Sequence, residues 1–259
     1  MRALTSYPIF AAKRYTMQIK NKTILITGGS SGVGLELAEQ LTAENTVLIC
    51  GRSQEKLDQA KANLPALHTF QCDLAKEQDR QNLIKWIQEE HPELSVLFNN
   101  AAIANSGNFF ELEDAMSLAQ KEMDINFIAP LHLSKALYPL LQKQSNSAIV
   151  NISSGLAYSP LAEYSFYNAT KAALHSFTQG LQLQGAHGNT QVVEVLLPVV
   201  DTPWHKGETP KGAISAKEAV DAMLKGIRNG QTEIRVGLTK VLYLVSRISP
   251  KLASKIING

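Results

Sequence analysis

The chain has 259 residues, 44% of them hydrophobic, with 25 basic residues against 23 acidic ones. This length suits one large α/β domain with a buried core, and the balanced charge gives no indication of nucleic-acid binding. The six histidines show no metal-ligand spacing and the two cysteines, Cys50 and Cys72, form no CxxC pair, so a catalytic metal and a structural disulfide have little support. We expect buried thiols of a reducing compartment, as in a cytoplasmic protein.

The first sixteen residues do not match a secretion signal. They contain no apolar run of seven or more residues, and Lys13 and Arg14 interrupt them. Strand-like sequence begins only after Met17. We therefore interpret residues 1–16 as a disordered or non-native extension and expect the folded domain to begin at residue 17.

Short β-branched runs then alternate with amphipathic stretches. The predicted strands are 23–27, 46–50, 68–72, 96–100, 148–153, 192–197 and 233–237. The predicted helices lie near 33–43, 53–63, 76–90, 112–143, 167–184 and 217–229. Nearly continuous apolar character is typical of strands that are covered on both faces. The alternation predicts a single α/β domain of the Rossmann type, a doubly wound parallel sheet of about seven strands with right-handed crossovers.

A glycine-rich turn, TGGSSGVG, joins the first strand to the first helix. It places Gly28, Gly32 and Gly34 where the chain leaves the strand. A phosphate can lie on the unpaired N–H groups of a helix only if the chain turns tightly and no Cβ blocks its approach. An ordinary βα loop that uses glycine for its geometry is the alternative, and the flanking strand and helix favour the nucleotide site.

Pro130 lies inside the long helix predicted over 112–143. Proline has no N–H, and its ring crowds the carbonyl four residues earlier, which here belongs to Asn126. We therefore expect a kink at this point and an Asn126 carbonyl without its helical partner. A kink that matters only for packing is the alternative.

Tyr167 and Lys171 stand four residues apart on the helix predicted over 167–184 and would share one face of it. To act as a base near pH 7, a tyrosine must lower its pKa from about 10, which requires roughly 4 kcal/mol. One ammonium about 4 Å away supplies about that energy at an effective dielectric near 20. Ser154 ends the strand thirteen residues before Tyr167, and period-two alternation turns Ser153 to the opposite face. An ordinary tyrosine–lysine pair is the alternative.

Residues 238–259 predict a basic amphipathic tail, because the segment from Arg235 to the end contains five basic residues and no acid. One helical face would carry the charges and the other the apolar side chains: Lys240, Arg247, Lys251 and Lys255 opposite Leu242, Val245, Leu252 and Ile256. Pro250 should begin a new helix. The tail is too short and too charged to span a bilayer. It could lie on an anionic membrane, but we favour packing, as a substrate lid or a subunit contact.

These motifs together resemble the short-chain dehydrogenase/reductase family, over residues 22–230. The resemblance rests on the Thr-Gly-x-x-x-Gly-x-Gly spacing of the turn, on Asn99-Asn100-Ala101 after the fourth strand, and on Asn126, Ser154, Tyr167 and Lys171. The GRS, CDL and SGLA segments are most similar to the DltE-type bacterial oxidoreductases of that family. The resemblance implies that residues 17–237 form a dinucleotide-binding catalytic domain.

The resemblance also implies catalytic roles. Tyr167 corresponds to the proton donor and acceptor. Lys171 corresponds to the lysine that lowers the pKa of that tyrosine and holds the nicotinamide ribose. Ser154 corresponds to the residue that binds the substrate oxygen, and Asn126 to the one whose main-chain carbonyl binds a water linked to the lysine.

The cofactor is predicted from the end of the second strand. NAD-selecting enzymes often place a carboxylate there, whereas this chain has Gly51 and then Arg52, a side chain that can bind a 2′-phosphate. NADP(H) is therefore favoured over NAD(H), although Arg52 could merely solvate a loop. Asp73 resembles the residue that contacts the adenine amino group, with a helix N-cap as the alternative. The other cofactor-binding residues implied by the resemblance are Thr27, Gly28, Ser30, Ser31, Gly32, Val33, Gly34, Leu74, Asn100, Ala101, Tyr167, Lys171, Val200 and Thr202.

The chain departs from the family pattern at two places. Ala102 stands where the family has glycine after Asn-Asn-Ala. In place of the family's Pro-Gly-x-Val-x-Thr the chain has Leu197-Pro198-Val199-Val200-Asp201-Thr202, in which Val200 and Thr202 match and the first two positions differ. Aromatic residues near the motifs are predicted to form an apolar substrate pocket: Phe109, Tyr158, Tyr164, Phe166 and Trp204.

We expect an NADP(H)-dependent oxidoreductase that interconverts a carbonyl and an alcohol, acts on a small molecule with an apolar body, and forms a homodimer or homotetramer. A regulatory protein that senses NADP(H) without turnover is the alternative. The intact Ser-Tyr-Lys-Asn set argues against it, because a pure sensor needs no proton donor.

Overall fold

The computed structural model describes residues 16–184, 189–205 and 209–259. The extension predicted over 1–16 therefore lies outside the described residues, apart from Thr16. Met17, the next residue, is completely buried against the core. Cys50 and Cys72 are free thiols and both are buried, as the sequence predicted.

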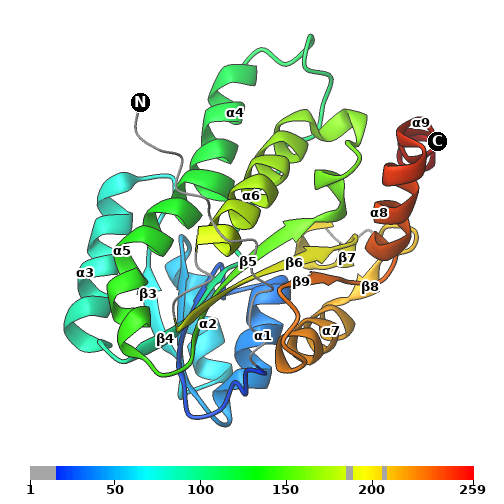
Figure 1. Ribbon diagram of the computed structural model, residues 1–259. Helices are drawn as coiled ribbons and strands as arrows, with labels where there is room; N and C mark the ends of the chain where they lie inside the picture. The colour runs from blue at the N-terminus through cyan, green and yellow to red at the C-terminus, as the bar shows by residue number, and fades with distance from the viewer. Residues whose placement is uncertain (1–15, 185–188, 206–208) are drawn as a thin grey trace, which may run out of the picture.

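Seven parallel strands form the central sheet (Figure 1). Their order across the sheet is β3-β2-β1-β4-β5-β6-β9. The strands are β1 (Thr23–Thr27), β2 (Thr46–Gly51), β3 (His68–Gln71), β4 (Leu94–Asn99), β5 (Ser147–Ser154), β6 (Thr190–Leu197) and β9 (Glu233–Arg235). The order reverses between β1 and β4, which is where ligands bind in open α/β sheets. The predicted doubly wound parallel sheet is confirmed.

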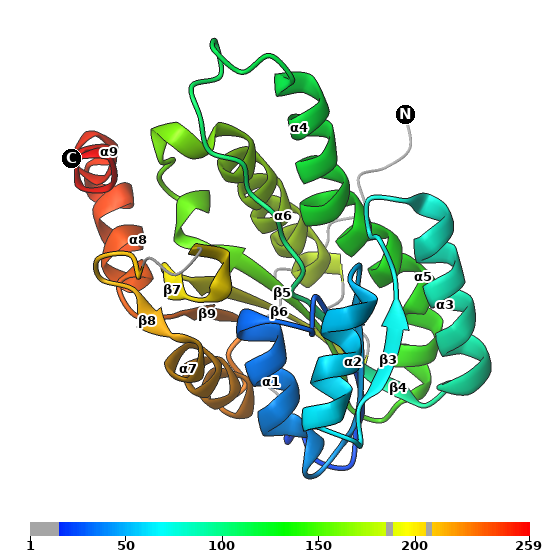
Figure 2. The same cartoon turned by 180° about the vertical axis from the view of Figure 1, so that it is seen from behind.

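Helices cover both faces of the sheet. On one face, visible in Figure 2, lie α1 (Gly32–Thr42), α2 (Gln54–Asn63) and α7 (Ala216–Arg228). On the other face, α3 (Glu77–Glu90) and α5 (Ala129–Lys143) pack into a second apolar core, and α6 (Ser165–Gln184) lies against β5 and β6. The central strands β1, β4 and β5 are buried along their whole length because each face of the sheet has its own apolar core, which explains their apolar sequences.

The helix predicted over 112–143 is not continuous. It consists of α4 (Ala115–Met123), one turn of π-helix (Asp124–Ile128) and then α5, which has Pro130 at its start. The missing N–H of Pro130 is therefore accommodated by a π turn rather than by a simple kink, and such turns are frequent at functional sites.

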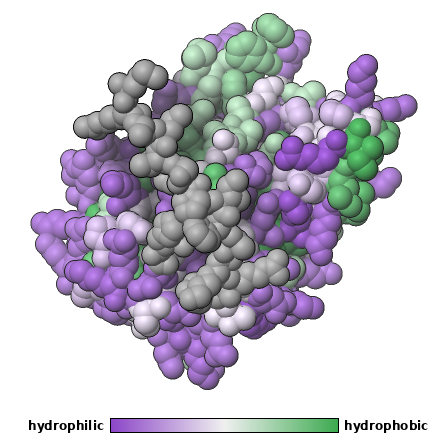
Figure 3. Space-filling model, in the orientation of Figure 1, coloured by the Kyte–Doolittle hydropathy of each residue, from purple (hydrophilic) through white to green (hydrophobic). Residues whose placement is uncertain are grey.

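The tail forms two helices, α8 (Thr239–Ile248) and α9 (Pro250–Asn258). Pro250 begins the second helix, as predicted, and the Ser249 hydroxyl accepts a hydrogen bond from the backbone N–H of Leu252. Figure 3 shows apolar surface over these helices. It includes Ile248, Leu252 and Ile256, all of which are exposed. Among the described residues, no helix has the length and apolar character needed to cross a bilayer.

The sequence analysis missed a short parallel pair, β7 (Val200–Asp201) with β8 (Ile214–Ser215), next to the end of β6. The pair directs the chain after β6 back across the carboxyl ends of the sheet strands. Two-residue strands carry no detectable alternation, so the sequence offered no signal for them.

The glycine turn after β1 packs too closely for a side chain at its last glycine. A Cβ on Gly34 would lie 2.3 Å from the Gly28 carbonyl oxygen and 2.6 Å from Asn100 Nδ2. By contrast, a Cβ on Gly180, within α6, would meet nothing within 4 Å. The turn and the loop after β4 are thus fitted to each other through Gly34.

We predict that Gly34→Ala lowers the free energy of unfolding by about 1–3 kcal/mol, because the turn must move to relieve the overlap. Gly180→Ala serves as the matched control and should raise it by up to about 1 kcal/mol, because alanine is the better helix former. Urea unfolding of both variants measures the difference. A Gly34→Ala protein as stable as the Gly180→Ala protein would contradict this packing argument.

Candidate active site

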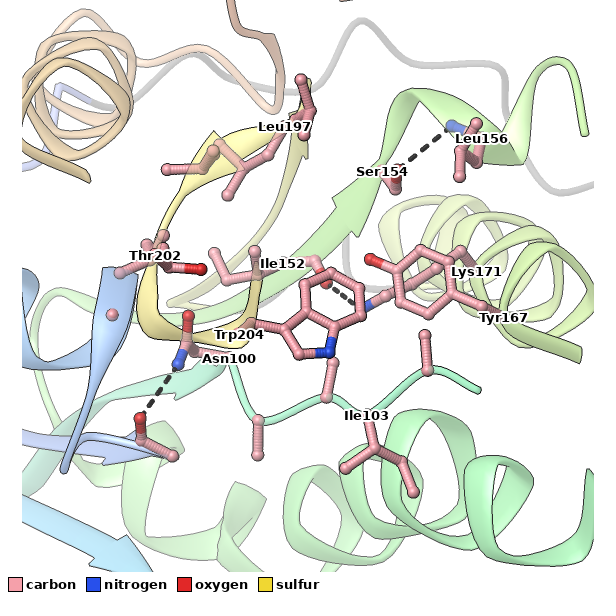
Figure 4. Close-up of a pocket in the computed structure, with 18 of the residues that line it drawn as sticks. Asn100, Ile103, Ile152, Ser154, Leu156, Tyr167, Lys171, Leu197, Thr202 and Trp204 are labelled. Atoms are coloured by element: carbon pink, nitrogen blue, oxygen red, sulfur yellow. Dashed lines mark hydrogen bonds between the residues drawn. The ribbon is translucent and has the colours of Figure 1, made fainter. Parts of the chain in front are cut away.

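A cavity of about 1140 Å³ opens at the carboxyl ends of the sheet strands. Its walls come from the turn after β1, the loops after β2, β4, β5 and β6, and the tail helices (Figure 4). Parallel strands present their carboxyl ends at one edge, so the fold brings motifs that are far apart in sequence to this one place.

The glycine turn forms one wall of the cavity. Gly28 and Gly32 have φ angles of +66° and +54°, a left-handed conformation that glycine adopts without strain. The turn residues that line the cavity are Gly28, Ser30, Ser31, Gly32, Val33 and Gly34. Within the described structure, the Ser31 side chain makes no capping hydrogen bond to α1, so the first N–H groups of that helix face the cavity side without a side-chain cap.

Thr27, predicted at the cofactor, lies behind the turn and does not line the cavity. Its hydroxyl accepts hydrogen bonds from the backbone N–H groups of Asn100 and Ala101 at 2.9 and 3.0 Å. The Asn100 side chain in turn donates to the Thr27 carbonyl at 2.9 Å (Figure 4). These bonds join the turn after β1 to the loop after β4, and both Asn100 and Ala101 line the cavity.

The end of β2 contributes a cationic corner. Arg52 lines the cavity together with Lys56, a residue that the sequence analysis did not single out. Asp73 and Leu74 line the same region. The Asp73 carboxylate accepts a hydrogen bond from the Ala75 N–H at 3.1 Å, and the residue at the N-cap of α3 is Lys76, so Asp73 is not the helix cap that was the alternative.

Tyr167 and Lys171 project from α6 into the cavity (Figure 4). Lys171 is only 2% exposed, and its ammonium donates a hydrogen bond to the Ile152 carbonyl at 2.7 Å. The ammonium nitrogen lies 5.5 Å from the centroid of the Tyr167 ring. The predicted face-sharing of the two residues is therefore present, but the lysine is fastened to the end of β5 rather than to the phenol oxygen.

The pKa of Tyr167 differs from the lowered value expected of a base. Burial raises the pKa of Tyr167 to about 12, against a lowering contribution from its hydrogen bonding with Ser154. Burial lowers the pKa of Lys171 to about 8. Tyr167 thus holds its proton near pH 7, which suits a proton donor, and a further positive charge is needed before it can serve as a base.

Ser154 ends β5, lines the cavity and accepts a hydrogen bond from the Leu156 N–H at 3.1 Å (Figure 4). Ser153 also borders the cavity, but its hydroxyl donates to the Lys171 backbone carbonyl at 3.5 Å. Ser153 is therefore engaged with the backbone of α6. Ser154 is left as the serine close enough to Tyr167 to oppose the rise in the pKa of that phenol.

Asn126 lies in the π turn and is completely buried. Its side chain accepts a hydrogen bond from the Ile103 N–H at 2.9 Å and donates to the Ile103 carbonyl at 2.8 Å and to the Thr170 hydroxyl at 3.1 Å. The sequence argument concerned only its main-chain carbonyl and missed this role. The side chain joins the loop after β4 to α6, one residue before Lys171.

Glu122 is a second buried polar residue that sequence reasoning missed. Its carboxylate accepts hydrogen bonds from the backbone and side-chain nitrogens of Asn105 at 2.6 and 2.9 Å. Burial raises the pKa of Glu122, and its charge contributes to raising that of Tyr167. A glutamate within an amphipathic helix gives no sequence signal of such a position.

The predicted aromatic pocket needs correction. Tyr164 and Trp204 line the cavity, and the Trp204 ring lies 6.0 Å from the Tyr167 ring. Phe109, Tyr158 and Phe166 do not line it. Phe109, on the loop after β4, packs against Phe166 of α6, and Tyr158, on the segment after β5, packs against Tyr243 of α8.

The remaining wall of the cavity is mostly aliphatic. It is formed by the segment after β6 and by the tail helices α8 and α9. Val200 and Thr202 line the cavity, and the Thr202 side chain packs next to Gly32, where an added Cβ would lie 3.3 Å from it. The tail residues that line it are Leu238, Thr239, Val241, Leu242, Val245, Ile256 and Ile257. The packing interpretation of the tail agrees with this placement, although Leu252, predicted on the same face, is exposed and outside the cavity.

The sequence of the chain is similar to that of known oxidoreductases. The family model described as short chain dehydrogenase matches residues 22–212. The uncharacterized oxidoreductase DltE of Bacillus subtilis is 44% identical over 225 residues, which cover 84% of this chain and 89% of DltE.

Two solved structures are similar. A short-chain dehydrogenase from Sphingobium yanoikuyae in complex with NADPH has a TM-score of 0.76 and 28% identity, covering 83% of this chain and 87% of that one. A short chain dehydrogenase/reductase from Burkholderia phymatum in complex with NAD has a TM-score of 0.81 at 18% identity, covering 94% of this chain and 97% of that one, and shows a shared fold alone.

The burial of Lys171 should make the free energy of unfolding depend on pH. The unfolded chain keeps the lysine proton up to a pKa of 10.5, whereas the folded protein releases it at about 8. Because the lysine pKa is lower in the folded than in the unfolded protein, its deprotonation stabilises the fold. This contribution is fully present above pH 10.5 and is lost as the pH falls through about 8. The stability difference, parent minus Lys171→Met, should therefore grow by about 3 kcal/mol between pH 7 and pH 10.5.

Urea unfolding of both proteins across this pH range measures the difference. Lys240→Met is the control, because Lys240 is exposed. Its difference from the parent should stay flat. A flat difference for Lys171→Met would show that the lysine is not desolvated in solution.

Proposed function

Because the chain belongs to the short-chain dehydrogenase family, we propose that it interconverts a carbonyl and an alcohol by hydride transfer with NADP(H), using Tyr167 as the proton donor and acceptor. The observation that carries the proposal is one cavity that holds the glycine turn, the Ser154 hydroxyl, the Tyr167 phenol and the buried Lys171 ammonium.

The residues of the cavity suit a dinucleotide. The first turn of α1 offers N–H groups without a side-chain cap, and the glycines around it leave room for phosphate oxygens. Bound there, NADP(H) would supply or accept the hydride. Lys171 lies deep in the same cavity, where its ammonium could donate to a ribose hydroxyl in addition to the Ile152 carbonyl.

In the reductive direction, Ser154 and Tyr167 would donate hydrogen bonds to the substrate carbonyl oxygen. As hydride reaches the carbonyl carbon, the C=O π bond breaks, and the oxygen takes the Tyr167 proton to give the alcohol. The phenolate left behind is stabilised by the Lys171 ammonium and is reprotonated from solvent. The raised pKa of Tyr167 keeps the phenol protonated near pH 7, as the proton donor of the reductive direction must be.

The aliphatic wall indicates the substrate class. Val241, Leu242, Val245 and Ile256 border the cavity, with Trp204 beside Tyr167, so a carbonyl compound with an apolar body fits it. Assembly as a homodimer or homotetramer, a cytoplasmic location and contact of residues 238–259 with a membrane stay predictions.

We predict that Tyr167→Phe lowers kcat for carbonyl reduction by about 10²–10⁴-fold, because it removes the proton donor. Binding of NADPH, measured by fluorescence titration, should change by less than about threefold. The assay follows loss of reduced-nicotinamide absorbance with aldehydes and ketones of increasing apolar size. Tyr164→Phe, the neighbouring cavity tyrosine, is the control and should retain turnover.

Two results of this assay would count against catalysis. Turnover that survives Tyr167→Phe would remove the tyrosine from the mechanism. Tight NADPH binding by the parent without reduction of any carbonyl in the panel would favour the alternative, a sensor of NADP(H) without turnover.

The preference for NADP(H) is supported by Arg52 and Lys56 at the end of β2, where two cations line the cavity. Arg52→Glu should weaken NADPH binding by about 10–100-fold, because a charge-assisted contact to the 2′-phosphate is lost. NADH binding should change by less than about threefold. Lys61→Glu, an exposed charge change on α2 outside the cavity, is the control. Equal weakening of both cofactors would contradict the assignment.

A further inference from the structure

A layer of polar side chains lies buried between α6 and the sheet. Lys171, His175 and Thr178 form one stripe of α6, spaced by four and three residues. Asn151 of β5 and Glu194 of β6 stand opposite each other in register and are buried beneath this stripe. The Asn151 amide donates to the Thr178 hydroxyl at 2.8 Å, and the His175 Nδ1 atom lies 2.7 Å from Glu194 Oε2.

Glu194 is the unusual member of this layer. It is 1% exposed, and its second carboxylate oxygen, Oε1, has no hydrogen-bond partner among the described residues. A buried carboxylate is costly unless positive charge compensates it. His175 supplies one partner for the carboxylate through its Nδ1 atom, and the His175 side chain is itself 12% exposed. The other cation on this stripe of α6 is the Lys171 ammonium, one helical turn before His175.

Lys171 is a buried cation, which a nearby negative charge would stabilise. Its ammonium is buried and donates a hydrogen bond to the Ile152 carbonyl, a neutral dipole. Burial lowers its pKa, and the charge of Glu194 is what opposes that lowering. The next residue after Glu194 in β6, Val195, is the register partner of Ile152, so the carboxylate and the lysine acceptor belong to neighbouring rungs of the same strand pair.

We propose that Glu194, in its pair with His175, is a positioning residue whose charge keeps the Lys171 ammonium protonated from beneath the site, so that the lysine can serve Tyr167 over a wider pH range than burial alone allows. The role in catalysis rests on the proposed function. The electrostatic coupling of Glu194 to Lys171 does not.

Protonation of His175 controls how much of the Glu194 charge acts on Lys171. Hydrogen bonding to Glu194 raises the pKa of His175, and the other groups facing the imidazole are Glu233, Arg247 and the Tyr158 ring. Below that pKa, the imidazolium neutralises the carboxylate. As pH rises through it, His175 loses its proton and the full carboxylate charge remains opposite Lys171. The stabilisation of the charged Lys171 by Glu194 thus increases as the pH approaches about 8, the pH at which burial would otherwise cause the lysine to lose its proton.

The direct test measures the lysine in the full-length protein without cofactor. Protein labelled with ¹³C at the lysine ε carbon is titrated by NMR, and Lys171→Arg assigns the signal. Glu194→Gln keeps the shape and removes the charge, and it should lower the Lys171 pKa by about one unit. His175→Gln keeps the carboxylate, and it should leave the Lys171 pKa at or above the parent value. An unchanged Lys171 pKa in Glu194→Gln overturns the proposal.

A second measurement keeps the test independent of whether Glu194→Gln folds. In the parent protein, the Lys171 signal should show an additional inflection at the pKa of His175, and His175→Gln should abolish it. Absence of this inflection in the parent overturns the coupling.

The pH profile of turnover then separates positioning from a merely structural role. Glu194→Gln should shift the alkaline limb of kcat/KM to lower pH by about one unit and leave KM for the carbonyl within about threefold near pH 7. A uniform loss of activity at every pH would overturn the positioning role. If the NMR coupling is present but no carbonyl is reduced, the proposed function fails and the pair stands.

Discussion

The hydrogen bond from the Lys171 ammonium to the Ile152 carbonyl is the interaction on which the geometry of the site depends. It fastens α6 to the carboxyl end of β5 at 2.7 Å, between two buried residues. Ser154 ends the same strand two residues later, and Tyr167 lies one helical turn earlier on α6. The relative positions of the serine, the phenol and the ammonium therefore follow from one contact between a strand end and a helix.

Polar side chains rather than apolar ones support this contact. Asn126 joins the loop after β4 to α6, and Asn99 donates to Asn151 at 2.8 Å in the layer beneath. Asn151 and Glu194 continue that layer toward the middle of α6. Such buried networks stabilise little compared with apolar packing, but they permit few alternative arrangements when every partner is present. These networks fix the positions of the site residues, which is a reason for this protein to retain them.

The apolar half of the cavity is built independently of this polar half. The wall comes from α8 and α9, which follow the last strand of the sheet and carry exposed apolar side chains, and from the chain around the short β7–β8 pair. The polar half is set by the sheet and α6, whereas the apolar half lies on the end of the chain. Among related proteins, the substrate wall can therefore vary while the acid/base groups stay the same.

The sequence determined the sheet, the glycine turn, the Tyr167–Lys171 pair and the helix start at Pro250, because each depends on local periodicity or on the backbone properties of glycine and proline. Tertiary structure alone decided the rest. The Lys171 acceptor, the side-chain contacts of Asn126, the placement of Glu122 and the His175–Glu194 pair all join residues that are distant in sequence and carry no local pattern. Tyr158 and Phe166 were assigned to the wrong surroundings for the same reason: proximity in sequence does not set the direction of a side chain. Burial also reversed the expected acidity of Tyr167, since desolvation is a property of the packed cavity and not of the tyrosine–lysine spacing.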